Sequence, residues 1–333
     1  MLKTSLYKAA VLGGDLRQVY LAETLAEHGI SVSVYGVCQV CSYSGIQEAS
    51  SLCEALNETD IVAAPVPFYR NGSIPGSENC PDLTGENLLN EMNPESILFA
   101  GAIPREIQKQ AEERRIQCID FLQEQSVITQ NTIATTEGIL AEAITRRSRT
   151  LFQSHCLVLG YGTCGSILVS YLKRLGCHVT VYEKEKVRSL RAQITADRSV
   201  CQERLPESLK EADFIFNTVP TMVLPKAMLG YVRKDCLILD LASAPGGVDY
   251  KAAEEMGIEA VLLPGLPGKY APASLGECMA KKMIESFRQN VKRKEELGIT
   301  AVLLPGLPGK YAPASSAEIL ADKIKSKWKL EGE

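Results

Sequence analysis

Short apolar runs alternate with amphipathic stretches along the first part of the chain. The apolar runs predict strands at residues 7–12, 31–35, 61–65, 97–100 and 117–121. The stretches between them, the first at residues 19–28, have the spacing of helices with one apolar face. Strands that alternate with helices are typical of a parallel sheet. We therefore expect residues 1–130 to form an α/β domain of their own.

The same alternation returns after residue 150. Strands are predicted at residues 156–159, 178–182, 213–219 and 236–242, and a further strand begins at Ala260. Residues 131–150 include a helix, at 139–149, that is expected to bridge two domains. The predicted fold class is therefore α/β, with doubly wound parallel-sheet domains at residues 1–130 and 151–293.

Three glycines follow the strand at 156–159. Gly160, Gly162 and Gly165 have the G-x-G-x-x-G spacing and lead into an amphipathic helix. The first glycine permits a tight turn, the second lets a pyrophosphate approach the backbone, and the third lets the helix pack on its strand. Amides at the helix start then face the phosphates. The second domain is therefore predicted to be a Rossmann dinucleotide-binding domain, with Thr163 and Cys164 in its turn.

Glu183 ends the next strand, about 20 residues past the glycines. An acid at this position bonds a ribose 2′-hydroxyl and repels a 2′-phosphate, which favours NAD. Lys184, Lys186 and Arg188 follow at once and would hold a 2′-phosphate if Glu183 turned away. The sequence leaves both NAD and NADP open.

Polar stretches follow several predicted strands. In an open parallel sheet, ligands bind at the carboxyl ends of the strands. The loop at residues 69–83 is rich in glycine and proline and follows a strand of the first domain. In the second domain the corresponding stretches are 217–220 and 240–249. From these we expect cofactor contacts at Asn217, Val219 and Pro220.

Length and net charge indicate how many domains to expect and which kinds of partner to exclude. The 333 residues exceed one ordinary core, and the net charge of −4 gives no sign of a nucleic-acid or membrane surface. The chain starts without a long apolar segment, so we expect it in the cytoplasm.

Eleven cysteines have no framework spacing, and Cys38 with Cys41 forms an isolated C-x-x-C. We expect no metal site.

A long repeat lies near the end of the chain. Residues 260–274 and 301–315 are identical in sequence. A doubly wound sheet has one position for this strand, so one copy should dock, and we expect the first copy to do so. Residues 294–333 are then a duplicated C-terminal segment, and truncation after about residue 293 should leave folding and nucleotide binding intact.

With these motifs assembled, the chain resembles the family of dipicolinate synthase A subunits from spore-forming Firmicutes. The matching stretches, in family order, are residues 13–15 with 17–18, 131–138, 160–165, 217–220, 240–243 with 245–247, and 264–268 with 271–272. Two features depart from the family pattern. Glu183 stands where the family more often has a small residue before an arginine, and the duplicated tail is foreign to it.

The resemblance implies a function. It implies oxidation of a dihydrodipicolinate-type precursor to dipicolinate (pyridine-2,6-dicarboxylate), with NADP as the family's expected cofactor, during sporulation in the mother cell. It also implies that the partner is a flavoprotein-like B subunit of dipicolinate synthase, and we expect a homo-oligomer. The order of domains is similar to that of D-2-hydroxyacid dehydrogenases.

Histidines are few, and none lies in a polar strand-end motif. His28 ends a helix, and His155 and His178 begin strands. A 2-hydroxyacid dehydrogenase needs a base, usually histidine, to take the hydroxyl proton. Aromatisation of a dihydropyridine fits this chain better, because the ring itself supplies driving force and the cofactor carries the hydride step.

A dicarboxylate substrate needs cations and hydrogen-bond donors. Arg17 is the candidate for a bidentate grip on one carboxylate, and Lys269 or the amides of Gly246 and Gly247 for the other. Glu137 is a candidate proton relay. The remaining substrate-side and hydrogen-bonding candidates are Gln18, Asn131, Thr135 and Ser243.

Other functions stay open at this point. One is an NAD-dependent 2-hydroxyacid or amino-acid dehydrogenase. Another is a non-catalytic dinucleotide-binding regulatory protein, in which the partner does the chemistry. A hydrolase that holds NAD permanently is a more distant alternative.

Overall fold

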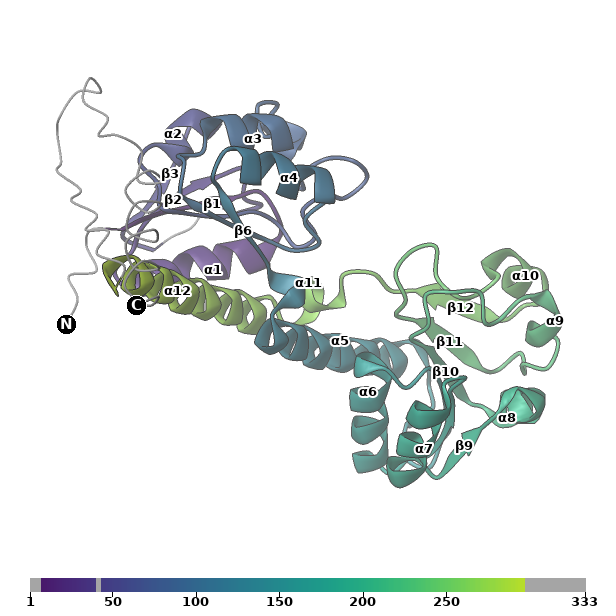
Figure 1. The fold of residues 1–333 in the computed structure, drawn as a ribbon. Coiled ribbons are helices and arrows are strands. Elements are labelled where there is room, and N and C mark those ends of the chain that lie inside the picture. Colours follow the sequence, from purple (N-terminus) through teal and green to yellow (C-terminus); the bar gives the residue numbers. More distant parts are fainter. Residues whose placement is uncertain (1–6, 40–42, 297–333) are drawn as a thin grey trace, which may run out of the picture. The chain divides into compact units, whose positions relative to one another are not determined.

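The computed structural model describes residues 7–39 and 43–296 (Figure 1). The described residues up to Lys282 belong to one compact unit, and those from Met283 on belong to a second. The described part of the second unit is the end of helix α12 (Pro272–Glu296). No helix in the described ranges is both long and apolar enough to cross a bilayer.

The first sheet is parallel, with strand order β3-β2-β1-β4-β5-β6. Its strands are β1 (Lys8–Leu12), β2 (Ser31–Tyr35), β3 (Ile46–Glu48), β4 (Ile61–Ala63), β5 (Ile97–Ala100) and β6 (Gln117–Asp120). Its helices are α1 (Leu16–Glu27), α2 (Leu52–Leu56), α3 (Gly85–Glu91) and α4 (Arg105–Glu113). Leu12, Phe68 and Leu98 are fully buried in its core. Burial on both sides is why its central strands are continuous apolar runs.

Helix α5 (Gln125–Arg146) differs from the prediction. It begins before residue 131 and ends before residue 149, so the expected boundary between residues 130 and 131 falls inside it. Glu137 therefore lies in the middle of a helix. Threonine and asparagine side chains do not interrupt it, because Thr132 and Thr135 turn their hydroxyls back onto carbonyls of the preceding turn.

The second sheet is also parallel, in the order β12-β11-β10-β7-β8-β9. Its strands are β7 (His155–Leu159), β8 (His178–Tyr182), β9 (Arg198–Val200), β10 (Phe214–Asn217), β11 (Leu237–Asp240) and β12 (Glu259–Leu262). Its helices are α6 (Thr163–Arg174), α7 (Lys186–Thr195), α8 (Leu205–Glu211), α9 (Lys226–Leu229) and α10 (Tyr250–Glu255). Short 3-10 turns lie at η2 (Ser77–Asn79), η3 (Phe121–Gln123) and η4 (Gln202–Arg204). Two doubly wound domains are therefore confirmed as the fold class.

The first copy of the repeat is part of this fold. It supplies edge strand β12, helix α11 (Leu266–Tyr270) and the first turn of α12. The expected boundary between residues 293 and 294 falls inside α12. The second copy, at residues 301–315, lies outside the described residues.

Candidate functional site

The turn between β7 and α6 has the geometry of a dinucleotide-binding turn. Gly160 has φ +94°, a left-handed conformation, and a Cβ there would lie 2.6 Å from Thr218 Oγ1. At Gly165 a Cβ would collide with the Gly160 carbonyl oxygen, so the helix packs directly on the turn. At Gly162 a Cβ would meet no described atom within 4 Å. The second glycine thus faces open space, as an approaching pyrophosphate requires.

The amides at the start of α6 are available to an anion. No side chain in the described part of the chain caps this helix at Gly162. Thr163 is exposed and Cys164 is half-buried, and burial raises the pKa of the Cys164 thiol. Uncapped amides and the positive end of a twelve-residue helix therefore fit a phosphate here.

The matching turn of the first sheet is closed. Asp15 caps α1 by accepting a hydrogen bond from the Arg17 amide, and the Gly14 amide donates to the Pro75 carbonyl at 2.7 Å. The loop after β4 thus occupies the space that a pyrophosphate would need. Asp15, Arg17 and Gln18 line a pocket at this turn instead.

Glu183, at the end of β8, is fixed beside the glycine turn. Its Oε2 accepts a hydrogen bond from the Tyr161 amide at 2.8 Å, and its Oε1 accepts one from the Glu185 amide at 2.9 Å. Lys184 is exposed, and Arg188 lies 4.0 Å from Glu185. In this structure Glu183 has not turned away from the turn.

A buried polar network shapes the carboxyl edge of the second sheet. Asn217 and Asp240 are fully buried, and Asn217 Nδ2 donates to Asp240 Oδ1 at 2.9 Å. Asp240 also accepts bonds from the amides of Ala242 and Gly247 and from the Tyr250 hydroxyl. These bonds fix both loops that follow β10 and β11.

The candidates at this edge were expected to contact the cofactor (Asn217, Val219, Pro220) or the substrate (Ser243, Gly246, Gly247), and they differ in exposure. The buried Asn217 holds the amide of Val219 with its side-chain oxygen, so it shapes the loop and presents no surface to a ligand. Val219 is half-buried, and Pro220 and Ser243 are exposed. Gly246 and Gly247 are buried, and the Gly247 amide is used by Asp240.

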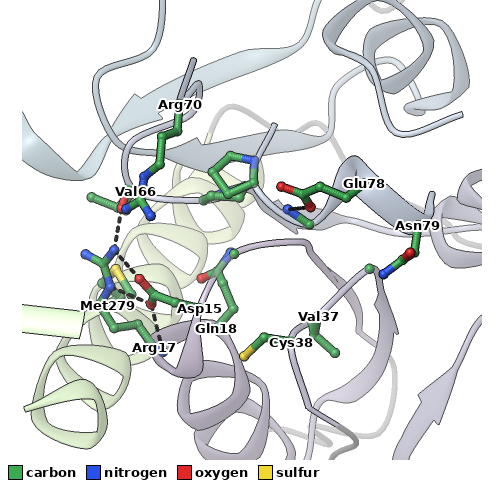
Figure 2. A pocket seen from close by; sticks show the side chains of 15 residues that line it. Asp15, Arg17, Gln18, Val37, Cys38, Val66, Arg70, Glu78, Asn79 and Met279 are labelled. Carbon is green, nitrogen blue, oxygen red and sulfur yellow. Dashed lines mark hydrogen bonds and ion pairs between the residues drawn. The ribbon is translucent and has the colours of Figure 1, made fainter. Parts of the chain in front are cut away.

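A pocket of about 390 Å³ lies at the carboxyl edge of the first sheet (Figure 2). It is lined by the segments that follow β1, β2 and β4, by the start of α1, by part of the 69–83 loop, and by Met279 of α12. Its volume lies within the usual range for small-molecule sites, roughly 300–1,000 Å³. The loop predicted to carry a ligand site therefore does line a pocket.

Arg17 lies in this pocket with only 7% of its surface exposed. Its Nε and Nη2 each lie 2.7 Å from an oxygen of Asp15, and Nη2 also donates to the Val66 carbonyl. Burial opposes ionisation of Asp15, but the hydrogen bonds and charge of Arg17 hold the pKa of Asp15 below its ordinary value. Arg17 thus makes a bidentate pair with Asp15 in this structure, and its expected grip on a substrate carboxylate stays a prediction.

Arg70 is a second cation at the same pocket. It is exposed, and among the residues that the structure describes it forms no ion pair. Glu78 lines the pocket as well and accepts a hydrogen bond from the Gly76 amide. Nothing in the sequence pattern singled out Arg70. The feature that could have identified Arg70 is its position after the end of β4, within the loop predicted to bind a ligand.

Lys269 has a partner far away in the sequence. Its Nζ lies 2.6 Å from Oε1 of Glu142, a residue of α5 that is 5% exposed. The Tyr270 hydroxyl and Arg146 Nε bind the same carboxylate. Lys269 therefore joins α11 to α5, and the expected grip on a substrate carboxylate is not seen.

The predicted site residues on α5 are half-buried or exposed. Asn131 and Thr135 are half-buried, and Glu137 is exposed, with its Oε1 3.4 Å from the Tyr171 hydroxyl. Because α5 starts at Gln125, Glu137 has no helix N-terminus to complement. Within the described residues, no group of three or more potential ligands is placed to hold a metal ion.

The three histidines lie away from the pocket. His155 and His178 are neighbours at the amino ends of β7 and β8, with ring centroids 5.0 Å apart, and His28 is an exposed helix cap. Ligands of parallel sheets bind at the opposite edge. A histidine base at the pocket, as a hydroxyacid dehydrogenase would use, is thus absent from the described residues.

Two family models match adjacent parts of the chain. The model for the N-terminal domain of the dipicolinate synthase A subunit matches residues 8–122. The model for the NAD binding domain of D-isomer specific 2-hydroxyacid dehydrogenases matches residues 121–233. The first match contains every pocket residue except Met279, and the second contains the glycine turn.

Known proteins match over most of the chain. The A subunit of dipicolinate synthase from Bacillus subtilis (strain 168) is 28% identical over 276 residues, which are 82% of this chain and 93% of that protein. The crystal structure of the same subunit from Bacillus subtilis matches with a TM-score of 0.75 at 27% identity, over 86% of this chain and 97% of that one. The A subunit from Bacillus halodurans has a similar fold, with a TM-score of 0.73 at 24% identity over 84% and 97%. In sequence and fold the chain is similar to the dipicolinate synthase A subunits, and its second domain matches a dehydrogenase-type NAD binding domain.

Proposed function

We propose that this chain oxidises a dihydrodipicolinate-type precursor to dipicolinate, with NAD as the hydride acceptor. The observation that carries the proposal is the pocket in the first domain. It lies within the segment matched by the domain model of the dipicolinate synthase A subunits, and the second domain of the same chain carries the dinucleotide turn. The domain matched by that model thus has a pocket of its own, which is suited to a small molecule.

The reaction balances without a metal. A dihydropyridine dicarboxylate loses one hydride and one proton and becomes a pyridine dicarboxylate. NAD, when bound, accepts the hydride and leaves as NADH. The protein's part is to hold both molecules, because a positioned donor and acceptor remove much of the barrier.

Specific residues account for both binding tasks. The α6 amides and Gly162 are suited to the pyrophosphate. Arg70 is suited to one substrate carboxylate. Arg17 is suited to the other if a substrate oxygen shares its guanidinium with Asp15. The proton lost from the ring needs no histidine, because aromatisation makes it easy to lose.

NAD is favoured over NADP because of Glu183. Its two oxygens are held by the Tyr161 and Glu185 amides, which fixes a negative charge beside the turn. A fixed carboxylate there bonds ribose hydroxyls and repels a 2′-phosphate. The match to an NAD binding domain supports a nicotinamide dinucleotide, and the choice of NAD over NADP is carried by Glu183 alone.

The name of the relatives also supports a partner and a cellular role. An enzyme whose chains are distinguished by letter has more than one kind of subunit, and we propose that this chain too works with a flavoprotein-like B subunit. By the same reasoning we propose that it acts in dipicolinate synthesis in the mother cell during sporulation, as a homo-oligomer joined to that partner.

The test is turnover by the full chain, alone and with the B subunit. A dihydrodipicolinate source and NAD should give NADH together with the ultraviolet absorbance of dipicolinate. Lactate and alanine serve as competing substrates. NADH formation from either of these, with none from the dihydropyridine, would replace the proposal with a 2-hydroxyacid or amino-acid dehydrogenase. Dipicolinate formation that needs only the B subunit would give this chain a regulatory role.

A further inference from the structure

The side-chain oxygen of Gln18 is a buried acceptor without a donor. Gln18 is 2% exposed and lines the pocket of the first domain. Its Nε2 lies 3.3 Å from the Leu12 carbonyl and 3.4 Å from the Ala63 carbonyl. Its Oε1 has no hydrogen-bond partner among the described residues. Figure 2 shows the amide end of Gln18 among the side chains that frame the pocket.

The orientation of this amide is set by its neighbours. If nitrogen and oxygen were exchanged, the oxygen would face the two carbonyl oxygens at the ends of β1 and β4. Two acceptors facing a third repel it, so the nitrogen belongs on that side. The oxygen is therefore the atom left for a ligand.

A buried acceptor selects ligands that bring a donor. Leaving such a group unsatisfied is costly, and a site built around one rejects analogues that lack the matching hydrogen. Carboxylates at neutral pH donate nothing, so they suit Arg17 and Arg70 but not Gln18. An N–H or O–H on the ring itself would suit Gln18.

We propose that Gln18 Oε1 accepts a hydrogen bond from a ring N–H or O–H group of the substrate. The ligand class is a reduced or hydroxylated six-membered ring with two carboxylates, and this inference rests on the proposed function. When an N–H ring is oxidised, a hydride goes from a ring carbon to NAD and the N–H proton goes to solvent. The aromatic dianion that results has no donor. Gln18 thus makes the pocket favour precursor over product.

The test uses three ligands of one shape with the full chain. Pyridine-2,6-dicarboxylate and its 4-methoxy derivative have no donor, whereas 4-hydroxypyridine-2,6-dicarboxylate has one as O–H or as the N–H of its tautomer. Calorimetry should show the hydroxy compound binding about tenfold more tightly than either of the others, the ratio expected for one hydrogen bond. In Gln18→Met, which keeps the length and removes the amide, the three affinities should become equal.

Alkylation of a pocket cysteine distinguishes failure of the Gln18 role from failure of the proposed pocket. Cys38 is exposed and lines the pocket, whereas Cys201 is exposed and is not a pocket residue. Bound ligand should slow alkylation of Cys38 and leave Cys201 unchanged. Protection of Cys38 with equal affinities for the three ligands in the unmodified chain would overturn the role of Gln18 alone. No protection by any ligand would overturn it together with the proposed pocket. The comparison in the unmodified chain decides even if Gln18→Met does not fold.

Discussion

Lys269 Nζ lies 2.6 Å from Glu142 Oε1, although the two residues are 127 positions apart in the sequence. Glu142 is buried, and the Tyr270 hydroxyl at 2.7 Å and Arg146 Nε at 2.9 Å complete its set of donors. One carboxylate thus ties the segment after β12 to α5. Gly268, the neighbour of Lys269, packs against Asp15 at the pocket, so this tie also supports the pocket edge.

We expect Glu142→Gln to destabilise the protein at neutral pH. The hydrogen bonds from Lys269 and Tyr270 lower the pKa of Glu142 from 4.5 to about 2. A carboxylate with a depressed pKa stabilises the fold above its unfolded pKa, and the contribution is lost as pH falls from about 4.5 to about 2. The variant should lose about 1–3 kcal/mol at pH 7.

Urea unfolding at several pH values measures this effect. The difference between Glu142→Gln and the unmodified chain should shrink as the pH falls below about 4.5. Glu137→Gln, an exposed glutamate on the same helix, is the matched control and should change little. A stability difference between Glu142→Gln and the unmodified chain that stays constant down to about pH 3 would contradict a stabilising role for the Glu142 charge.

The glycine turn offers a pair of matched substitutions. Gly160→Ala should lower the melting temperature, because φ is +94° and the new Cβ would crowd Thr218 and Val219. Gly162→Ala should leave folding intact, because its Cβ meets open space, but should weaken NAD binding by filling the approach of the pyrophosphate. Thermal melting with and without NAD separates the two effects. Unchanged NAD affinity in Gly162→Ala would argue against this turn as the cofactor site.

Substitution of Glu183 should change the choice between NAD and NADP. Glu183→Gln keeps the length of the side chain and removes the charge that repels a 2′-phosphate. The ratio of NADP to NAD affinity should rise by about tenfold, or about 1.4 kcal/mol. Fluorescence titration with NADH and NADPH measures it. Glu185→Gln, which removes a nearby charge that caps α7, should leave the ratio unchanged. If both variants and the unmodified chain have the same ratio of NADP to NAD affinity, Glu183 does not decide between the two cofactors.

The parts of the fold that the sequence predicts are those with strong local signals. The strands at 31–35, 97–100 and 178–182 are fully apolar or alternate cleanly, and the structure has them at these bounds. Edge strands β3 and β9 were not predicted. They are three residues long and only partly buried, so they carry little hydrophobic pattern.

The site was less predictable than the fold. Arg17, Gln18 and the 69–83 loop do meet in one pocket, because they follow neighbouring strands. Lys269 was predicted to hold a substrate carboxylate. The structure pairs it with Glu142, which lies on another element, so no local sequence pattern links the two. Asp240 was noticed only as part of a polar stretch. Its role depends on Tyr250 and Gly247, which the loop brings back to it.

Removal of the Tyr250 hydroxyl should weaken the hydrogen-bond network around Asp240 and lower the stability of the protein. Tyr250 donates to the fully buried Asp240 at 2.7 Å, and burial together with that bond raises the pKa of Tyr250. Tyr250→Phe leaves a buried charged oxygen with one donor fewer and should cost about 1–3 kcal/mol of stability. Tyr231→Phe, an exposed tyrosine of the same domain, is the control. Urea midpoints that fall equally in both variants would contradict a specific role for this bond.

Truncation tests the duplicated segment. Edge strand β12 is formed by residues of the first copy, and Leu237, Ile238, Leu239 and Asp240 of β11 pair with it in register. The position that the repeated strand can take in this sheet is therefore filled. A chain that ends at residue 296, the last residue of α12, should keep the melting temperature and the NAD affinity of the full chain. A chain that ends at residue 258 lacks β12, α11 and α12 and should unfold far more easily, which makes it the control for loss of folded structure. A large fall in melting temperature already at residue 296 would mean that the second copy contributes to the folded domain.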